Sequence, residues 1–159
     1  MAKHGLAPLL CPDPIVLVLG SLPGDESIRR QEYYGNPRNM FWRVLAAVFE
    51  DAVPETYPEK KAFLTRHHVA LWDVYASAER RGSLDANIHD ITPNDISGFL
   101  KEHPSIKAIA LNGGKSARAF KTVLSVMYGR SGKCSFKWSK IWAADRNGAA
   151  FSWSTMKSR

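Results

Sequence analysis

Cysteine is scarce in this sequence: Cys11 and Cys134 are the only two among 159 residues. They stand too far apart for a metal-ligand or redox motif, and a small disulfide-stabilised secreted protein would need more of them. Long apolar runs are also absent, because runs such as residues 15–19 are far shorter than the ~20 residues of a membrane helix. The N-terminus carries no basic stretch followed by a long apolar one. We therefore expect a cytoplasmic protein with reduced thiols and no membrane contact.

Acidic residues are scarce in the last third of the chain. After residue 100 there are 12 lysines and arginines but only 2 acidic residues, whereas residues 1–100 carry 10 basic and 13 acidic ones. The net charge of +7 therefore comes from the C-terminal part. A concentrated basic region attracts polyanions, since neutralising phosphates releases counterions. The charge alone leaves two alternatives, a nucleic-acid partner or a solvated face that only aids solubility.

Apolar runs of strand length alternate with helical patterns along the chain. Buried strands are predicted at residues 15–19, 69–74 and 106–111, with further strands near 136–143 and 149–153. Helices are predicted at residues 40–50, 59–67 and 115–127, and one more begins at Thr92 or Asn94. Residues 1–13, 20–37 and 79–91 are predicted to be a lead-in, a long loop and a connector. The pattern is typical of an α/β fold with a mostly parallel sheet covered on both faces, in a single domain over residues 1–159.

Ligands of parallel sheets bind beyond the carboxyl ends of the strands, which here are residues 20–24, 73–77 and 112–116. The first end is the turn Gly20-Ser21-Leu22-Pro23-Gly24, whose glycines let a ligand approach the backbone. Such a turn also serves as a plain connection. The third end lacks the first glycine of a phosphate-binding P-loop, because Ile109 occupies that position. Its Lys115 and Ser116 remain candidate contacts for a single phosphate, or the turn is an ordinary strand-to-helix connection.

Aromatic residues cluster in the segment 33–42, which reads Tyr-Tyr-Gly-Asn-Pro-Arg-Asn-Met-Phe-Trp. Phe41 and Trp42 are predicted to fill the core, and the helix that follows Asn39 is predicted to bury Phe41, Leu45, Val48 and Phe49. Tyr34, beside a glycine, is the better candidate for one wall of a flat slot that holds a base.

Few residues in this sequence have the spacing of metal ligands or of a catalytic pair of carboxylates. No pair of carboxylates has the pattern of a glycosidase dyad, and Asp25 and Glu26 either contact a ligand or lie in solvent. His67 and His68 have no cysteine or carboxylate at ligand spacing and are predicted to finish a helix. We therefore expect neither a metal nor another cofactor.

The segment 20–42 resembles the first motif of the mismatch-specific uracil-DNA glycosylases. It is more similar still to that of the hypoxanthine (deoxyinosine) DNA glycosylases of the same superfamily. Those proteins combine a Gly-Ser-x-Pro-Gly turn, paired aromatics and Pro-x-Asn-x-Phe-Trp, and each element is present here without gaps. Residues 71–74 and 111–115 also resemble the family's next two strand ends, so that the resemblance covers about residues 14–125. It implies a three-layer α/β/α fold.

The resemblance also implies an activity. A DNA-repair enzyme of this kind flips a deaminated base, hypoxanthine and also uracil, out of the duplex and hydrolyses its N-glycosidic bond. Tyr34 matches the aromatic residue that stacks on the flipped base. The other base-binding residues implied are Gly20, Ser21, Leu22, Gly24 and Asn112.

The catalytic residue implied by the resemblance is Asn39. Mismatch-specific enzymes position the attacking water with an asparagine where this chain has Leu22, which has no polar group. Asn39 also suits a helix N-cap, and the two roles are compatible. A neutral amide can orient water without removing a proton if bond breakage precedes attack.

The C-terminus departs from the family, whose members end in a proline-containing loop that enters the minor groove, followed by a helix. Here Ser154 and Thr155 stand at roughly the right distance, and we expect them to contact DNA. We also expect this departure to slow the enzyme. The resemblance implies a monomer on double-stranded DNA in the nucleoid. The main alternative is a nucleic-acid-binding protein of the same fold without turnover, and the next is a small-nucleotide-binding domain.

Overall fold

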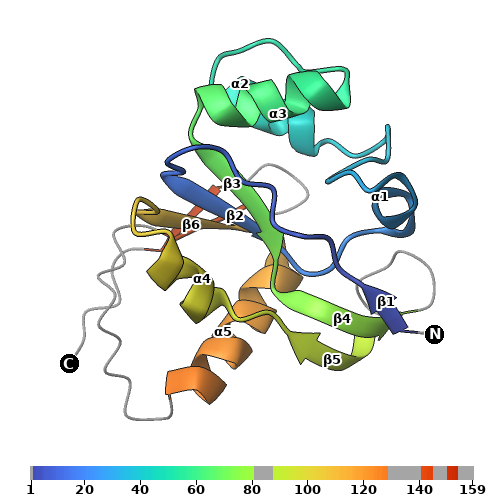
Figure 1. Ribbon diagram of the computed structural model, residues 1–159, viewed down its shortest axis with the longest axis vertical. Coiled ribbons are helices and arrows are strands. Elements are labelled where there is room, and N and C mark those ends of the chain that lie inside the picture. The colour runs from blue at the N-terminus through green and yellow to red at the C-terminus, as the bar shows by residue number, and fades with distance from the viewer. Residues whose placement is uncertain (1, 81–87, 129–140, 145–149, 154–159) are drawn as a thin grey trace.

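The structure is a computed structural model that describes residues 2–80, 88–128, 141–144 and 150–153. Its central sheet has five strands in the order β3-β2-β6-β7-β8 (Figure 1). These are β2 (Val16–Gly20), β3 (Val69–Asp73), β6 (Ala108–Asn112), β7 (Ile141–Ala144) and β8 (Ala150–Trp153). β2 pairs in parallel with β3 and β6, β6 pairs in parallel with β7, and β8 is antiparallel to β7. The α/β class is confirmed, as are the strands predicted within the described residues, while residues 136–140 and 149 of the last two predictions lie outside them.

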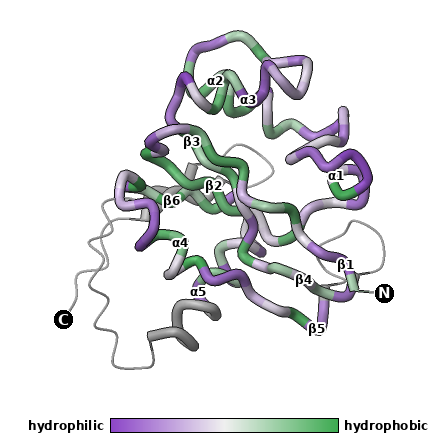
Figure 2. Tube along the Cα trace, in the orientation of Figure 1, coloured by the Kyte–Doolittle hydropathy of each residue, from purple (hydrophilic) through white to green (hydrophobic). Residues whose placement is uncertain are grey.

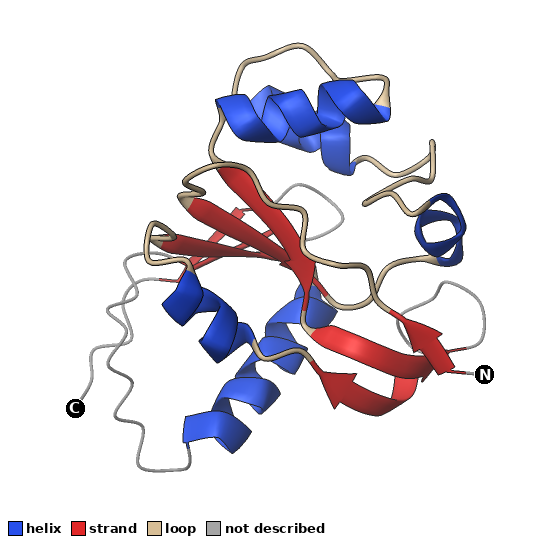
Figure 3. Cartoon of the chain, viewed as in Figure 1, coloured by secondary structure: helices blue, strands red, loops and turns tan. Residues whose placement is uncertain are grey.

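Helices cover both faces of this sheet (Figure 3). Helices α2 (Phe41–Val48) and α3 (Tyr57–Arg66) lie on one side, and α4 (Ile96–Glu102) and α5 (Gly114–Tyr128) lie on the other. Thr56 begins α3 with a capping box, in which it accepts from the Glu59 N–H and its own N–H donates to the Glu59 carboxylate. The arrangement is the three-layer sandwich that the resemblance implies.

The strands carry apolar side chains on both faces, which is why the central strands are green along their length in Figure 2. Because successive residues alternate between faces, Leu17 and Leu19 join one core cluster and Val18 joins the other. The first cluster includes Phe99 of α4 and Phe120 of α5. The second cluster contains Tyr33, Trp42 and Leu64, among other side chains. Both faces of the sheet are therefore sealed by helices.

A second, smaller sheet was not expected from the sequence. It is antiparallel, with the strand order β1-β4-β5, and consists of β1 (Ala2–His4), β4 (Tyr75–Arg80) and β5 (Ile88–Pro93). The predictions of a loose lead-in over residues 1–13 and a connector over 79–91 were therefore wrong in these stretches. β5 is exposed over residues 89–93, and β1 pairs with a strand more than 70 residues later, as in Ala2 with Glu79. Neither feature leaves a local apolar pattern.

Two further predictions were wrong. The stretch 20–37, predicted to be a loop throughout, contains helix α1 (Asp25–Arg30), which has acidic residues in its first turn and arginines in its last. Val48, predicted to face the core, is 70% exposed, because α2 turns Trp42 and Ala46 inward instead. No helix in the described ranges is both long and apolar enough to cross a membrane.

Candidate functional site

Three polar or small residues end the central parallel strands and lie at one edge of the sheet. Gly20 ends β2 and is the register partner of Asp73, which ends β3. On the other side β2 pairs with β6, which ends in Asn112. The Gly20 carbonyl accepts from the Val74 N–H at 2.9 Å, and the Ser21 carbonyl accepts from the Tyr75 N–H at 3.1 Å. The turn after β2 is therefore fixed against the start of β4.

Gly20 has no room for a side chain. A β-carbon built on it would stand 2.5 Å from Asp73 Oδ1 and 3.4 Å from the Tyr34 hydroxyl oxygen. The Asp73 carboxylate would have to shift to admit a β-carbon, whereas the distance to Tyr34 is an ordinary contact. A glycine at the end of β2 therefore lets the Asp73 carboxylate keep its place.

Tyr34 carries the aromatic wall of the site. Its backbone is left-handed, with φ of 53°, which is unusual for a bulky residue. Its ring stacks on Phe41 with centroids 3.7 Å apart and an interplanar angle of 15°, and its hydroxyl accepts from Asn112 Nδ2 at 2.9 Å. A residue of the loop after β2 is thereby joined to the end of β6, 78 residues along the chain.

Asn39 lies two residues before Phe41, in an exposed loop of residues 36–40. Its Oδ1 accepts from the Phe41 N–H at 2.9 Å, so its side chain contacts the first residue of α2. The N-cap of α2 is Met40, so the predicted N-cap position was wrong by one residue. The loop borders a shallow depression of about 420 Å³ lined by Glu26, Arg30, Asn36, Pro37 and Arg38. Asn39 directly follows Arg38, which lines this depression, and it stands two residues before Phe41, the ring on which Tyr34 stacks.

Asp73 is the site residue that the sequence did not single out. It is 4% exposed, which is rare for an aspartate. Burial, followed by the charge of Asp73, raises the pKa of the neighbouring Tyr33 well above its usual range. The only local signal was its place at the end of an apolar run, because its neighbours Gly20 and Tyr33 are distant in sequence.

The remaining predicted base-binding residues surround the turn after β2. Ser21 is buried, and the Leu22 side chain belongs to the core cluster of Leu17 and Leu19. Gly24 is the N-cap of α1 and accepts from the Ile28 N–H. Only backbone atoms of Leu22 and Gly24 can therefore offer hydrogen bonds to a ligand.

The predicted DNA-binding residues differ in how far their side chains are exposed. Lys115 is partly exposed in the first turn of α5. Ser116 is 1% exposed and donates its hydroxyl proton to the Gly113 carbonyl at 2.8 Å, so its side chain is engaged within the turn. Ser154 and Thr155 lie outside the described residues.

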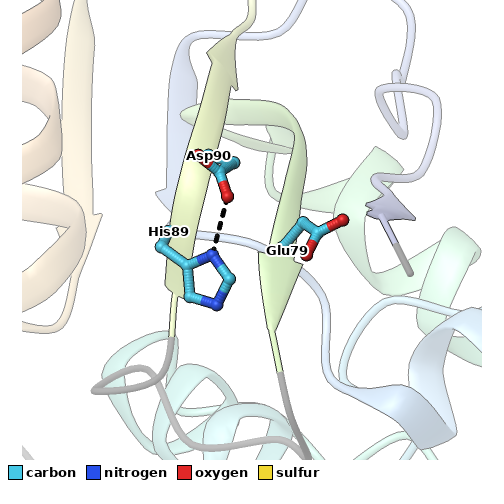
Figure 4. Close-up of side chains that lie close together, drawn as sticks. All are labelled: Glu79, His89 and Asp90. Atoms are coloured by element: carbon cyan, nitrogen blue, oxygen red, sulfur yellow. Dashed lines mark hydrogen bonds and ion pairs between the residues drawn. The ribbon is translucent and has the colours of Figure 1, made fainter.

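Potential metal ligands gather away from the strand ends, on the β4–β5 hairpin. Glu79, His89 and Asp90 each offer one ligand atom, and these atoms lie within 4.8 Å of one another (Figure 4). His89 Nδ1 is 3.0 Å from Asp90 Oδ2, and both residues are exposed. Within the described part of the chain, no second feature points to a bound ion there. His67, by contrast, ends α3 as predicted and lies 2.8 Å from Asp51 Oδ2.

A glycine turn, an aromatic ring and an amide thus lie together at the carboxyl ends of the parallel strands of this α/β protein. The profile of the Uracil DNA glycosylase superfamily matches residues 7–155. The chain belongs to this superfamily, and DNA glycosylase is the class of enzyme that its sequence and fold support.

Similar proteins come from two Methanosarcina species. The chain is 42% identical over 117 residues to the hypoxanthine DNA glycosylase of Methanosarcina acetivorans, covering 73% of this chain and 74% of that protein. It is 38% identical over 128 residues to the hypoxanthine DNA glycosylase of Methanosarcina barkeri, covering 80% of each. A solution NMR structure of a Methanosarcina acetivorans protein, described there as a candidate uracil DNA glycosylase, superposes with a TM-score of 0.69 at 38% identity. That match covers 80% of this chain and 79% of the other.

Proposed function

We propose that this protein is a DNA-repair glycosylase that removes hypoxanthine, and also accepts uracil, from double-stranded DNA. The observation that carries the proposal is the Tyr34 ring, stacked on Phe41 and tied to Asn112 above the Gly20 turn. The names of the two Methanosarcina relatives support hypoxanthine as the base.

The flipped base would stack on the face of Tyr34 that Phe41 does not cover. Base-to-aromatic stacking contributes roughly 1–3 kcal/mol, which offsets the few kcal/mol that unstacking from the duplex costs. The backbone of Gly20, Ser21, Leu22 and Gly24 would line the slot. Asn112 would read the edge of the base through its amide.

Asn39 would orient the water that attacks the sugar. As the C1′–N9 bond breaks, its electron pair leaves with the base, which takes up a proton, and the sugar becomes oxocarbenium-like. Water then adds to C1′ and loses a proton to solvent. An amide suits this sequence because it can hold water in place without having to remove a proton early. Neither a metal nor another cofactor is needed for these steps.

DNA phosphates would be held by the first turn of α5 and the basic residues that follow. Backbone N–H groups at a helix start attract anions, and Lys115 stands among them. Arg118 and Lys121 are exposed on the same helix. Ser116 would contribute through its backbone, and Ser154 and Thr155 would complete the contact. We propose that the protein acts as a monomer in the nucleoid.

Duplexes carrying one inosine, uracil or undamaged adenine test this proposal. After incubation and alkali treatment, strand scission at inosine, slower scission at uracil and none at adenine are expected. A mobility shift without scission at any base would support the alternative, a binding protein that keeps the fold without turnover.

A further inference from the structure

The Tyr34 hydroxyl stands between two polar groups that come from different strands. It accepts a hydrogen bond from Asn112 Nδ2 at 2.9 Å, at the end of β6. It also lies above Gly20 together with Asp73 Oδ1, since both oxygens are within 3.4 Å of the position of a β-carbon there. The three side chains therefore form a row across the ends of β3, β2 and β6.

The hydrogen bond between Tyr34 and Asn112 determines how the Asn112 amide is oriented. A phenol oxygen can accept hydrogen bonds as well as donate one, and the Tyr34 oxygen accepts from the NH₂ group of Asn112. The Asn112 amide then presents its NH₂ group to Tyr34, and its carbonyl oxygen is left for the ligand.

We propose that the Tyr34 hydroxyl is a specificity-determining group, which orients Asn112 so that its carbonyl oxygen faces the base. This inference rests on the proposed function and specifies how the same site selects its substrate. Hypoxanthine and uracil both carry a ring N–H beside a carbonyl group, and an amide oxygen accepts from that N–H. Adenine carries an acceptor nitrogen in the corresponding position, so the same oxygen repels it.

The tyrosine is needed for this role beyond its ring. Phenylalanine would keep the stack on Phe41, which involves only the ring. The adjacent Tyr33 cannot substitute, because it is 3% exposed and donates to the Leu6 carbonyl at 3.3 Å. The ring of Tyr34 thus stacks, and its hydroxyl orients Asn112. The Tyr34→Phe substitution removes the second property and keeps the first.

The test compares the affinity of uncleavable 2′-fluoro duplexes that carry either hypoxanthine or unsubstituted purine, which lacks the ring N–H and the carbonyl. The use of uncleavable DNA removes differences in leaving-group quality. Wild-type protein is expected to prefer hypoxanthine by roughly tenfold or more, the range of one or two hydrogen bonds. Tyr34→Phe is expected to reduce that preference about 5-fold while still binding both duplexes.

Two variants make the result specific. Asp73→Asn keeps the Tyr34 hydroxyl but replaces the carboxylate that lies beside it above Gly20, and it is expected to reduce the preference as well. Asp13→Asn removes an exposed carboxylate just before β2, at the opposite end of the strand, from a left-handed position that asparagine tolerates, and it should leave the preference unchanged. Melting temperatures establish that each variant is folded.

The outcomes separate this inference from the proposed function. Wild-type protein that excises hypoxanthine, together with Tyr34→Phe and Asp73→Asn variants that keep the full preference, overturns the inference alone. Wild-type protein that neither excises nor prefers hypoxanthine overturns the proposed function. If Tyr34→Phe does not fold, a folded Asp73→Asn decides the result, since loss of the preference supports the inference and retention overturns it.

Discussion

At the scale of single residues, the site depends on groups that share very little space. A methyl group on Gly20, at the end of β2, would overlap the Asp73 carboxylate and would touch the Tyr34 hydroxyl. Because Asp73 ends the neighbouring strand, a small change at Gly20 would move a side chain of another element.

We expect Gly20→Ala to destabilise the protein by about 1–3 kcal/mol and to impair base excision, because the new methyl group would displace the Asp73 carboxylate. Thermal unfolding and single-turnover excision measure the two effects. Gly114→Ala is the matched control, since no atom lies within 4 Å of its β-carbon position at the start of α5. Equal melting temperatures for the two variants would contradict the crowding described at Gly20.

Asn39 combines a structural bond with the proposed catalytic role, and substitutions can separate them. Asn39→Ala is expected to lower the single-turnover rate by about 100-fold or more, while duplex affinity changes little, because the group acts in the transition state. The lost bond to the Phe41 N–H should cost about 1 kcal/mol of stability.

Asn39→Ser provides the control for this prediction. A serine hydroxyl can still accept from the backbone at the start of α2, so the melting temperature should stay near that of the wild type. The excision rate should remain low, because the amide is gone. Recovery of the full rate in this variant would mean that Asn39 is only a cap.

At the scale of elements, the sequence predicts well those strands that are buried on both sides. β2, β3 and β6 are continuous apolar runs bounded by turn residues, and they appear in the structure close to the predicted positions. β5 was missed because its residues 89–93 are exposed, and β1 because its partner β4 is far along the chain.

The site shows the same division between local and long-range signals. Tyr34, Asn39 and Gly20 were identified because they occupy one motif. Asp73 was not, since its significance comes from contacts with Gly20 and Tyr33 that join separate strands and loops. The bond between Tyr34 and Asn112 spans 78 residues and has no signature in either segment.

Helices α2 and α3 are joined by an acidic residue whose ionisation can be tested by pH. Hydrogen bonds from Arg66 and then His67 lower the pKa of Asp51 well below its ordinary value of 3.8. A carboxylate with a lowered folded-state pKa stabilises the protein above its unfolded pKa, and this stabilisation is lost as the pH falls through the folded value.

We therefore expect the melting temperature of wild-type protein to fall as the pH is lowered from 6 to about 3. Asp51→Asn should flatten that decline and lower the melting temperature at pH 6. A variant whose melting temperature follows the wild-type curve over the whole range would show that the Asp51 contacts contribute no stability.

At the scale of the whole molecule, the charge distribution predicts that electrostatic attraction contributes to DNA binding. The excess of basic residues after residue 100 includes Lys115, Arg118 and Lys121 on α5. Duplex affinity should weaken steeply with salt, since each phosphate contact releases counterions. Reversing Lys115 and Lys121 to glutamate should reduce the slope of log affinity against log salt. An affinity that is constant between low and moderate salt would remove the electrostatic account.

The central claim, that this fold excises hypoxanthine and does not merely bind DNA, is tested most directly by measuring the free base. A duplex with a single inosine is incubated with excess protein, and the released base is quantified by chromatography over time. The account predicts release of one hypoxanthine per duplex, with a rate that collapses in Asn39→Ala. Tight binding of the inosine duplex with no hypoxanthine released would contradict it.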